Sequence, residues 1–458
     1  MTMATPNMDT PFQPRPSRRI STFPTPPPPQ ELRLGISGFR YADLHDPAGL
    51  ERLFEHFSAW FAKEDAEAHA AWSAWRVQPE TLGSVALSAL LVRVAPFVGR
   101  YLAQLFAIER ESERLSDAIL ADQPLFDFRK NFLKKRVLRG DAGKGFRFDE
   151  AAASGLAALV FAWGARSGDD EEMRVARSSL ALTALATKLR GGASDASLAA
   201  LKAALHASPK LAALWDEVRA EVATLEAGDE DRALVDWLLS AVEACLVARH
   251  RDPSDSMFRW TSMYVPHKHD FEALVPLRRK NPALPEQVEG PEEQRRQRSE
   301  PFALTDRRGS RREVAREVDY CIYCHERDKD SCSKGLRDKQ GAVRKNPLGV
   351  DLKGCPLDEK IGEMHQLRLQ GEAIAALAVV AVDNPMMPGT GHRICNDCMK
   401  ACVYQKQEPV NIPLAETRVL EDVNSMERLL IDGTEQGTVA VLSILGVTVV
   451  LFASELSR

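Results

Sequence analysis

The chain has 458 residues, of which 44% are hydrophobic and 27% charged, and it carries a formal net charge of −5. This composition is ordinary for a globular protein of two or three domains, and the small acidic excess excludes a general attraction to nucleic acid or to acidic membranes. Residues 1–30 contain no apolar segment of the kind that forms the centre of a signal peptide. We therefore expect a cytoplasmic protein.

The N-terminal part of the chain divides into a tail and a helical region. Residues 1–32 are rich in proline, serine and threonine and cannot bury enough apolar surface to fold, so they are predicted to be disordered. Residues 33–250 are predicted to form a helical bundle, because apolar residues recur at helical spacing and prolines are rare. Alanine-rich helices are expected at residues 150–166, 174–190, 196–206 and 229–249.

Residues 251–317 are predicted to be a linker. From Arg278 to Arg316 the chain is dense in arginine and contains several prolines, which favours an extended segment. The arginines are mixed with glutamates, and no aromatic platform accompanies them. For this reason no nucleic-acid partner is predicted.

Cysteines mark the next region, residues 318–423. Seven of the eight cysteines lie there in two groups, each with a C-x-x-C pair: Cys321, Cys324, Cys332 and Cys355, then Cys395, Cys398 and Cys402. Clustered thiols in an odd number argue against a secreted disulfide framework. A C-x-x-C pair offers two thiolates to one metal centre, and a Cys-Pro ending such as Cys355-Pro356 is typical of bacterial [4Fe–4S] sites. Zinc is the alternative, but seven cysteines are too many for one four-ligand site and one short for two.

The residues around these cysteines resemble a known family. The motifs follow one another as Gly354-Cys355-Pro356-Leu357, Asp383-Asn384-Pro385, Gly391-His392-Arg393-Ile394-Cys395 and Pro409-Val410-Asn411-Ile412. Over roughly 100 residues they resemble the two-cluster iron–sulfur domain of the glutamate synthase small subunit and of the N-terminus of dihydropyrimidine dehydrogenase. The resemblance implies a mostly helical domain with two [4Fe–4S] clusters, which together with the predicted helical bundle makes the chain all-α.

The same resemblance implies the ligands of each cluster. The first cluster would take Cys321, Cys324, Cys332 and Cys398. The second would take Cys355, Cys395, Cys402 and a group that is not a cysteine in one branch of the family, near whose place Glu416 lies. The sequence departs from the family in a long gap between the third and fourth cysteines, filled by the basic insert Lys334–Lys353, and in a tighter spacing of the last three cysteines.

Two further predictions concern helices and the end of the chain. Residues 357–382 are predicted to form two helices that are split near Gly371. Residues 424–458 include an apolar run at the short edge of a membrane span, but its β-branched residues and glycine favour a helix followed by a strand. We interpret this segment as the remnant of a nucleotide-binding domain that lacks the G-x-G-x-x-G motif.

Together these features predict an iron–sulfur electron-transfer module or subunit of a flavin- and NAD(P)-dependent oxidoreductase. FAD and NAD(P) would be bound by a partner subunit or by a domain missing from this chain. No catalytic acid, base or nucleophile stands out, so no complete catalytic site is predicted, and membrane association is not expected. The alternative is a zinc-stabilised helical interaction protein without redox activity.

Overall fold

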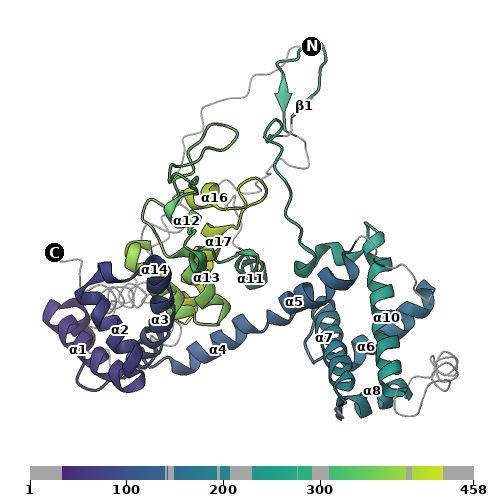
Figure 1. The fold of residues 1–458 in the computed structure, drawn as a ribbon, viewed down its shortest axis with the longest axis horizontal. Helices are drawn as coiled ribbons and strands as arrows, with labels where there is room; N and C mark the ends of the chain where they lie inside the picture. Colours follow the sequence, from purple (N-terminus) through teal and green to yellow (C-terminus); the bar gives the residue numbers. More distant parts are fainter. Residues whose placement is uncertain are drawn as a thin grey trace, which may run out of the picture.

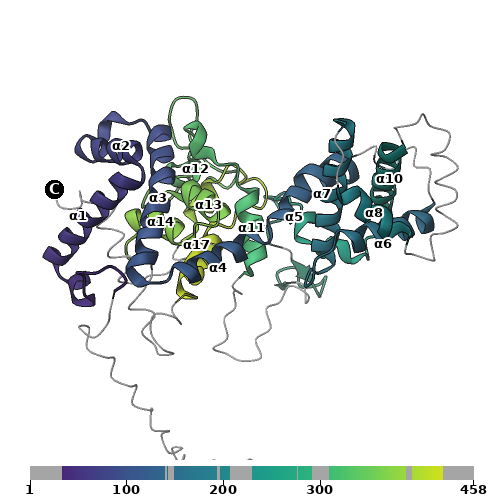
Figure 2. The same ribbon diagram turned by 90° about the horizontal axis from the view of Figure 1, so that it is seen from below.

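The computed structural model describes residues 34–139, 142, 149–192, 196–206, 230–275, 277–290, 309–387 and 395–426. The predicted proline-rich tail and almost all of the apolar C-terminal segment therefore lie outside the described residues. The described part is mostly helical, which confirms the prediction of a helical protein. Two groups of helices lie side by side along the longest axis, and α4 (Glu109–Leu120) leads from one to the other (Figures 1 and 2).

The first group joins the N-terminal helices to helices of the cysteine-rich region around one large hydrophobic core, and a second, smaller core surrounds the cysteines. From the N-terminal part it contains η2 (Tyr41–His45), α1 (Pro47–Glu64), α2 (Ala66–Val77), η3 (Pro79–Thr81), α3 (Ser84–Phe106) and α4. From the cysteine-rich region it contains α11 (Arg311–Tyr320), η9 (Cys324–Arg327), α12 (Ser331–Lys334), α13 (Ile361–Leu369), α14 (Ala373–Asp383), α16 (Asp397–Ala401) and α17 (Ile412–Asn424). The split between α13 and α14 confirms the prediction for residues 357–382; Gly371 between them has a φ of 84°, which favours glycine.

Helix α3 is the centre of this first group. It is the one helix of the described residues that is long and apolar enough to cross a membrane by length and composition. Its apolar residues belong to the first core, where α3 packs against α14, and Figure 1 shows these two helices next to each other. The two helices approach closely at Gly99, where a Cβ atom would lie 3.3 Å from the backbone nitrogen of Ala375. Helix α3 thus serves here as a core helix on which the cysteine-rich region packs.

The second group has its own core, formed by the alanine-rich helices. It consists of α5 (Gln123–Phe128), the π-helical segment η4 (Arg129–Val137), α6 (Glu150–Trp163), α7 (Glu171–Arg190), α8 (Ala196–His206), α10 (Glu230–Arg251), η6 (Ser256–Arg259) and η7 (Thr261–Met263). The four predicted alanine-rich helices are confirmed as α6, α7, α8 and α10. Aspartates begin two of them: Asp149 accepts a hydrogen bond from Ala152 N–H at 2.7 Å, and Asp170 accepts one from Met173 N–H at 2.8 Å.

The boundaries of these groups differ from those expected from the sequence. Residues 33–250, interpreted as one bundle, are divided between two cores, because α3 and α4 pack against α13 and α14, and α1 and α2 share that core. The predicted linker, residues 251–317, also has both of its ends packed into a hydrophobic core. Trp260 belongs to the second core, and α11 packs in the first. Between them, β1 (Arg278–Arg279) and β2 (Val288–Glu289) form a small antiparallel ladder with Arg278 opposite Glu289, and Figure 1 shows β1 away from both groups.

A buried ion cluster connects three helices of the first group. Asp422 of α17 is fully buried. Its carboxylate accepts hydrogen bonds from Arg418 at 2.8 Å in the same helix, from Arg368 of α13 at 3.0 Å, and from Arg311 of α11 at 3.2 Å. Since Arg368 is itself only 2% exposed, this cluster holds α17 against α11 and α13.

Candidate metal centre

Four cysteines line one cavity at the surface of the first group. They are Cys321, Cys324, Cys332 and Cys402. The walls between them are formed by apolar side chains and one imidazole: Ile361, Val403, Val410, Ile412 and His365. Segments far apart in the chain, at the end of α11, in α12 and after α16, therefore bring four thiols to one place.

The local backbone positions the first C-x-x-C pair. Cys321 caps the C-terminus of α11, where its N–H donates to Glu317 C=O at 3.2 Å. Tyr323 then adopts a left-handed conformation with φ of 51°. This turn directs the Tyr323 N–H toward Cys321 Sγ at 3.4 Å and begins η9 at Cys324. A tight turn of this kind directs both thiols of the pair into the same cavity.

The other three cysteines form a second set with a glutamate. Electrostatic interactions connect the thiol of Cys398 with Glu416, Cys355 and Cys395, and connect Cys355 with Glu416. Cys395 is exposed, Cys355 is partly buried and Cys398 is buried. Glu416 thus lies close enough to Cys355 and Cys398 to affect their charge, and its role as the non-cysteine ligand stays a prediction.

The two sets differ from the ligand order that the resemblance implies. Cys402, assigned to the second set, lies with Cys321, Cys324 and Cys332, whereas Cys398 lies with Cys355 and Glu416. Helical geometry explains the exchange. Cys398 is in α16, and Cys402 caps the end of that helix with a ψ of 142°, so the chain turns after α16 and the two thiols are directed to different sets.

The basic insert does not separate the third and fourth cysteines in space. The Cys355 N–H donates to Cys332 C=O at 2.9 Å, and the insert leaves and rejoins the domain between them. Gly335 and Gly354 both have a φ of 87°, and a Cβ atom on Gly354 would overlap with the backbone nitrogen of Gly335. Only glycine permits this approach and this conformation. The insert is thus a loop whose two ends meet beside the cysteines.

A pair of stacked tyrosines fixes the two cysteine segments to each other. Tyr320 precedes the first C-x-x-C pair, and Tyr404 follows Cys402 by two residues. Their rings are nearly parallel, with centroids 4.4 Å apart and an interplanar angle of 11°. Tyr404 also lines the cysteine cavity, so the stack connects α11 to one wall of that cavity.

Burial dominates the electrostatics of the thiols. It raises the pKa of Cys321 to about 12 and raises the pKa of Cys332 well above its ordinary value. Burial also raises the pKa of Cys402, and the backbone N–H groups of Tyr404 and Val410 oppose this increase. These thiols would lose their protons on binding a cation, because nearby positive charge favours the thiolate.

The second set contains a pair of carboxyl groups. Burial raises the pKa of Glu416 to about 9, and the charge of neighbouring Glu359 adds to that increase. Glu359 is 5% exposed and accepts a hydrogen bond from Asn384 Nδ2 at 2.9 Å. Burial and the nearby Glu359 carboxyl group therefore both disfavour the charged form of Glu416.

His365 is a site residue that the sequence analysis missed. It is 1% exposed, lines the cysteine cavity, and has no hydrogen-bond partner at either ring nitrogen among the described residues. Burial, with the nearby charges of Arg368 and His325, lowers its pKa to about 3, so its imidazole is neutral. The one signal in the sequence is helical spacing, since His365 follows Ile361 by four residues and both line the same cavity.

His325 packs against the first turns of α13. Its Nε2 is 3.2 Å from Gln366 Oε1, and its ring rests on Gly362, where a Cβ atom would overlap with Nδ1. His392, the other histidine near a cysteine, lies outside the described residues.

Among the described residues, no three His, Cys, Asp or Glu side chains form a group of the kind that could hold one metal ion.

Replacing Gly362 with alanine should destabilise the protein. The added methyl group overlaps with the buried ring of His325, and overpacking of this kind costs about 1–3 kcal/mol. Gly155→Ala in α6 is the matched control, because nothing lies within 4 Å of its added Cβ, and alanine in a helix stabilises by about 0.5–1 kcal/mol. Urea unfolding checks both. Equal midpoints for the two variants would contradict the expected clash.

Comparisons with known proteins match limited parts of the chain. Residues 34–107, which contain α1 to α3, match a family model described as the RP005 N-terminal alpha-helical domain. Two proteins of Rickettsia prowazekii (strain Madrid E) match short stretches. "Uncharacterized protein RP006" is 70% identical over 37 residues, which are 8% of this chain and 5% of that protein. "Uncharacterized protein RP005" is 50% identical over 58 residues, which are 11% of this chain and 20% of that protein.

These comparisons concern sequence segments and not a whole protein. The chain spans a fifth or less of the length of both relatives, and neither printed name states an activity. No solved structure matches the chain. The residues that match the family model include α3, and this helix contacts α13 and α14 of the cysteine-rich region.

Proposed function

We propose that this chain is an electron-transfer component of a flavin- and NAD(P)-dependent oxidoreductase and that its cysteine-rich region binds two [4Fe–4S] clusters. The observation that carries the proposal is the convergence of Cys321, Cys324, Cys332 and Cys402 on one cavity. Four thiolates are the usual ligand set of a four-iron cluster. Each bound cluster would supply one-electron transfer.

The surroundings of this cavity support an iron–sulfur site. Apolar side chains of Ile361, Val410 and Ile412 form its walls, and an apolar shell limits the access of water to a metal site. Backbone N–H groups point at the thiols, for example from Tyr323 to Cys321. Such N–H groups stabilise the negative charge of the sulfurs. The neutral ring of His365 has a free N–H that could donate to a sulfur in the same cavity.

The second cluster would be held by Cys355, Cys395, Cys398 and Glu416. Three thiols and one carboxyl group make four ligands, and the electrostatic interactions among them support a common site. Glu416 would contribute an oxygen ligand after losing its proton. Oxygen is a harder ligand than sulfur, so this cluster would differ in reduction potential from the first.

The flavin and the nicotinamide would belong to a partner subunit or to a further domain. This part of the proposal rests on the resemblance of the cysteine motifs to the two-cluster family and on the chemistry of hydride transfer, which clusters do not perform. The role of this chain would be to pass single electrons to or from that flavin.

Metal analysis tests the proposal. The full chain, purified without air, should contain about eight iron atoms and eight acid-labile sulfides, four of each per cluster. It should be brown and should bleach on reduction with dithionite, and electron paramagnetic resonance should then show two reduced clusters. Stoichiometric zinc without sulfide would contradict the proposal and would support the zinc-stabilised interaction protein.

A further inference from the structure

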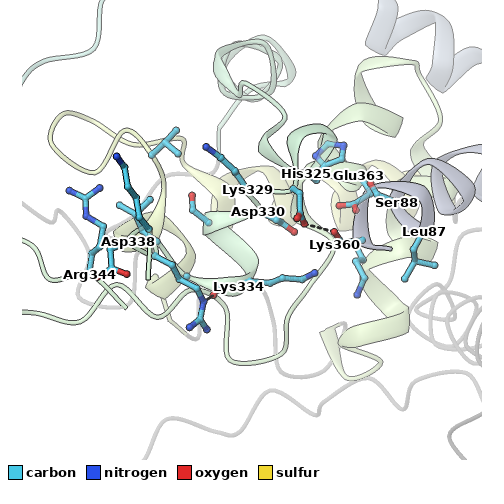
Figure 3. A pocket seen from close by; sticks show the side chains of 18 residues that line it. Leu87, Ser88, His325, Lys329, Asp330, Lys334, Asp338, Arg344, Lys360 and Glu363 are labelled. Carbon is cyan, nitrogen blue, oxygen red and sulfur yellow. Dashed lines mark hydrogen bonds between the residues drawn. The ribbon is translucent and has the colours of Figure 1, made fainter. Parts of the chain in front are cut away.

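A larger cavity lies beside the cysteines, between the start of α3 and the basic insert (Figure 3). Its volume is about 720 Å³, within the range of cavities that bind small organic molecules. Three of its lining residues, Asp330, Ser331 and Val403, also line the cysteine cavity. One layer of residues therefore separates this second cavity from the thiols.

Six cations from the insert and its flanks line the cavity, and Figure 3 shows Arg344 at one end and Lys360 at the other. The cationic lining residues are Lys329, Lys334, Arg337, Lys339, Arg344 and Lys360. Two of them are occupied within the protein. Lys360 pairs with Asp383 at 3.0 Å, and Arg337 donates to the backbone oxygens of Lys334 and Gly341. The side chains of Lys329, Lys334, Lys339 and Arg344 form no ion pair with any described residue.

The opposite end of the cavity has different chemistry. Figure 3 shows Glu363, His325, Ser88 and Leu87 there, at the far side from Arg344. Glu363 is 2% exposed and His325 5% exposed, and Glu363 Oε2 and His325 Nδ1 have no hydrogen-bond partner among the described residues. A buried polar atom without a partner is costly. Both side chains line the cavity; His325 Nδ1 faces Gly362, so the Glu363 carboxyl group is the one that a ligand with hydrogen-bond donors would satisfy.

We propose that this cavity binds a nucleotide. The phosphates would contact Lys329, Lys334 and Arg344, because these cations form no ion pair with any described residue and outnumber the carboxylates of Asp328, Asp330 and Asp338 once Arg337, Lys339 and Lys360 are counted. The base or sugar would lie at the other end, where its N–H or O–H donors reach the Glu363 carboxylate and Leu87 offers an apolar contact. Neither phosphate alone nor an uncharged nucleoside satisfies both ends of the cavity. The proposal does not depend on whether the neighbouring thiols bind iron.

Calorimetric titration of the full chain with ATP, adenosine and tripolyphosphate tests the assignment. We expect ATP to bind more tightly than either of its halves. Lys334→Gln/Arg344→Gln should weaken ATP binding by about tenfold or more, because each substitution removes a charged hydrogen-bond donor from the phosphates. Glu363→Gln should weaken ATP and adenosine and leave tripolyphosphate unchanged.

The matched control is Lys345→Gln/Lys353→Gln. It removes the same number of charges from the same insert, and neither lysine lines the cavity. This variant should bind ATP as the unaltered chain does. No ATP binding, or an equal loss in the two double variants, would overturn the proposal. So would tripolyphosphate binding as tightly as ATP, because the Glu363 end of the cavity would then contribute nothing.

Discussion

The double variant Cys321→Ala/Cys402→Ala should retain about four iron atoms per chain, half of the eight expected for two clusters. Both thiols line one cavity, so removing the second after the first destroys no further site. By the same reasoning, Cys321→Ala/Cys398→Ala should retain almost no iron, because Cys398 interacts with Cys355 and Glu416 instead. Iron and sulfide analysis of the two variants, purified without air, measures this difference.

The two variants separate the structural grouping from the order that the family resemblance implies. That order places Cys398 with Cys321 and therefore predicts the opposite result, with four irons left in Cys321→Ala/Cys398→Ala. Cys245→Ala is the control for iron lost during purification, because Cys245 is buried in α10 of the other helical group. It should keep all eight irons. Four irons in both double variants, or in neither, would contradict the grouping.

Local features of the chain could be predicted from its sequence. The alanine-rich helices follow from helical periodicity and from aspartates at their starts, such as Asp149 and Asp170. The division of residues 357–382 follows from Gly371. The cysteine-rich region is evident because two C-x-x-C pairs are rare by chance. Each of these signals acts within a few residues and needs no knowledge of the tertiary structure.

The grouping of the cysteines and the division of the bundle could not be predicted in this way. Cys398 and Cys402 are four residues apart, and only the end of α16 between them directs their thiols to different sets. The closure of the basic insert depends on Gly335 and Gly354, which are 19 residues apart and meet only in the folded chain. Likewise, the sequence predicts α1–α4 as helices of the bundle, yet α3 and α4 pack against α13 and α14 from the other end of the sequence.

His365 shows the same limit for a single residue. In the sequence it is one histidine within a helical segment, and a buried histidine with satisfied nitrogens is the ordinary expectation. In the structure neither nitrogen has a partner among the described residues, and the ring faces a cavity lined by four thiols. This cavity forms because Cys402 and Val403, which follow α16, lie beside Cys321 at the end of α11. No local sequence pattern predicts that contact.

The second large effect is expected at Asp422. Replacing Asp422 with asparagine should destabilise the first helical group by about 3–5 kcal/mol, because breaking a buried ion pair leaves an uncompensated charge. Arg368 is 2% exposed and would keep its charge without the carboxylate 3.0 Å away, while Arg311 and Arg418 would each lose the same partner. Urea unfolding followed by circular dichroism measures the loss.

Asp351→Asn is the matched control for this substitution. Asp351 pairs with Lys345 on the basic insert at 3.7 Å, and both side chains are exposed, by 43% and 65%. An exposed pair of this kind contributes about 0–1 kcal/mol, so the unfolding midpoint should change little. Because Asp422 connects α17 to α11 and α13, which carry the cysteine cavity, Asp422→Asn should also lower iron retention on mild warming. Equal stability of the two variants would show that the buried cluster does not hold these helices together.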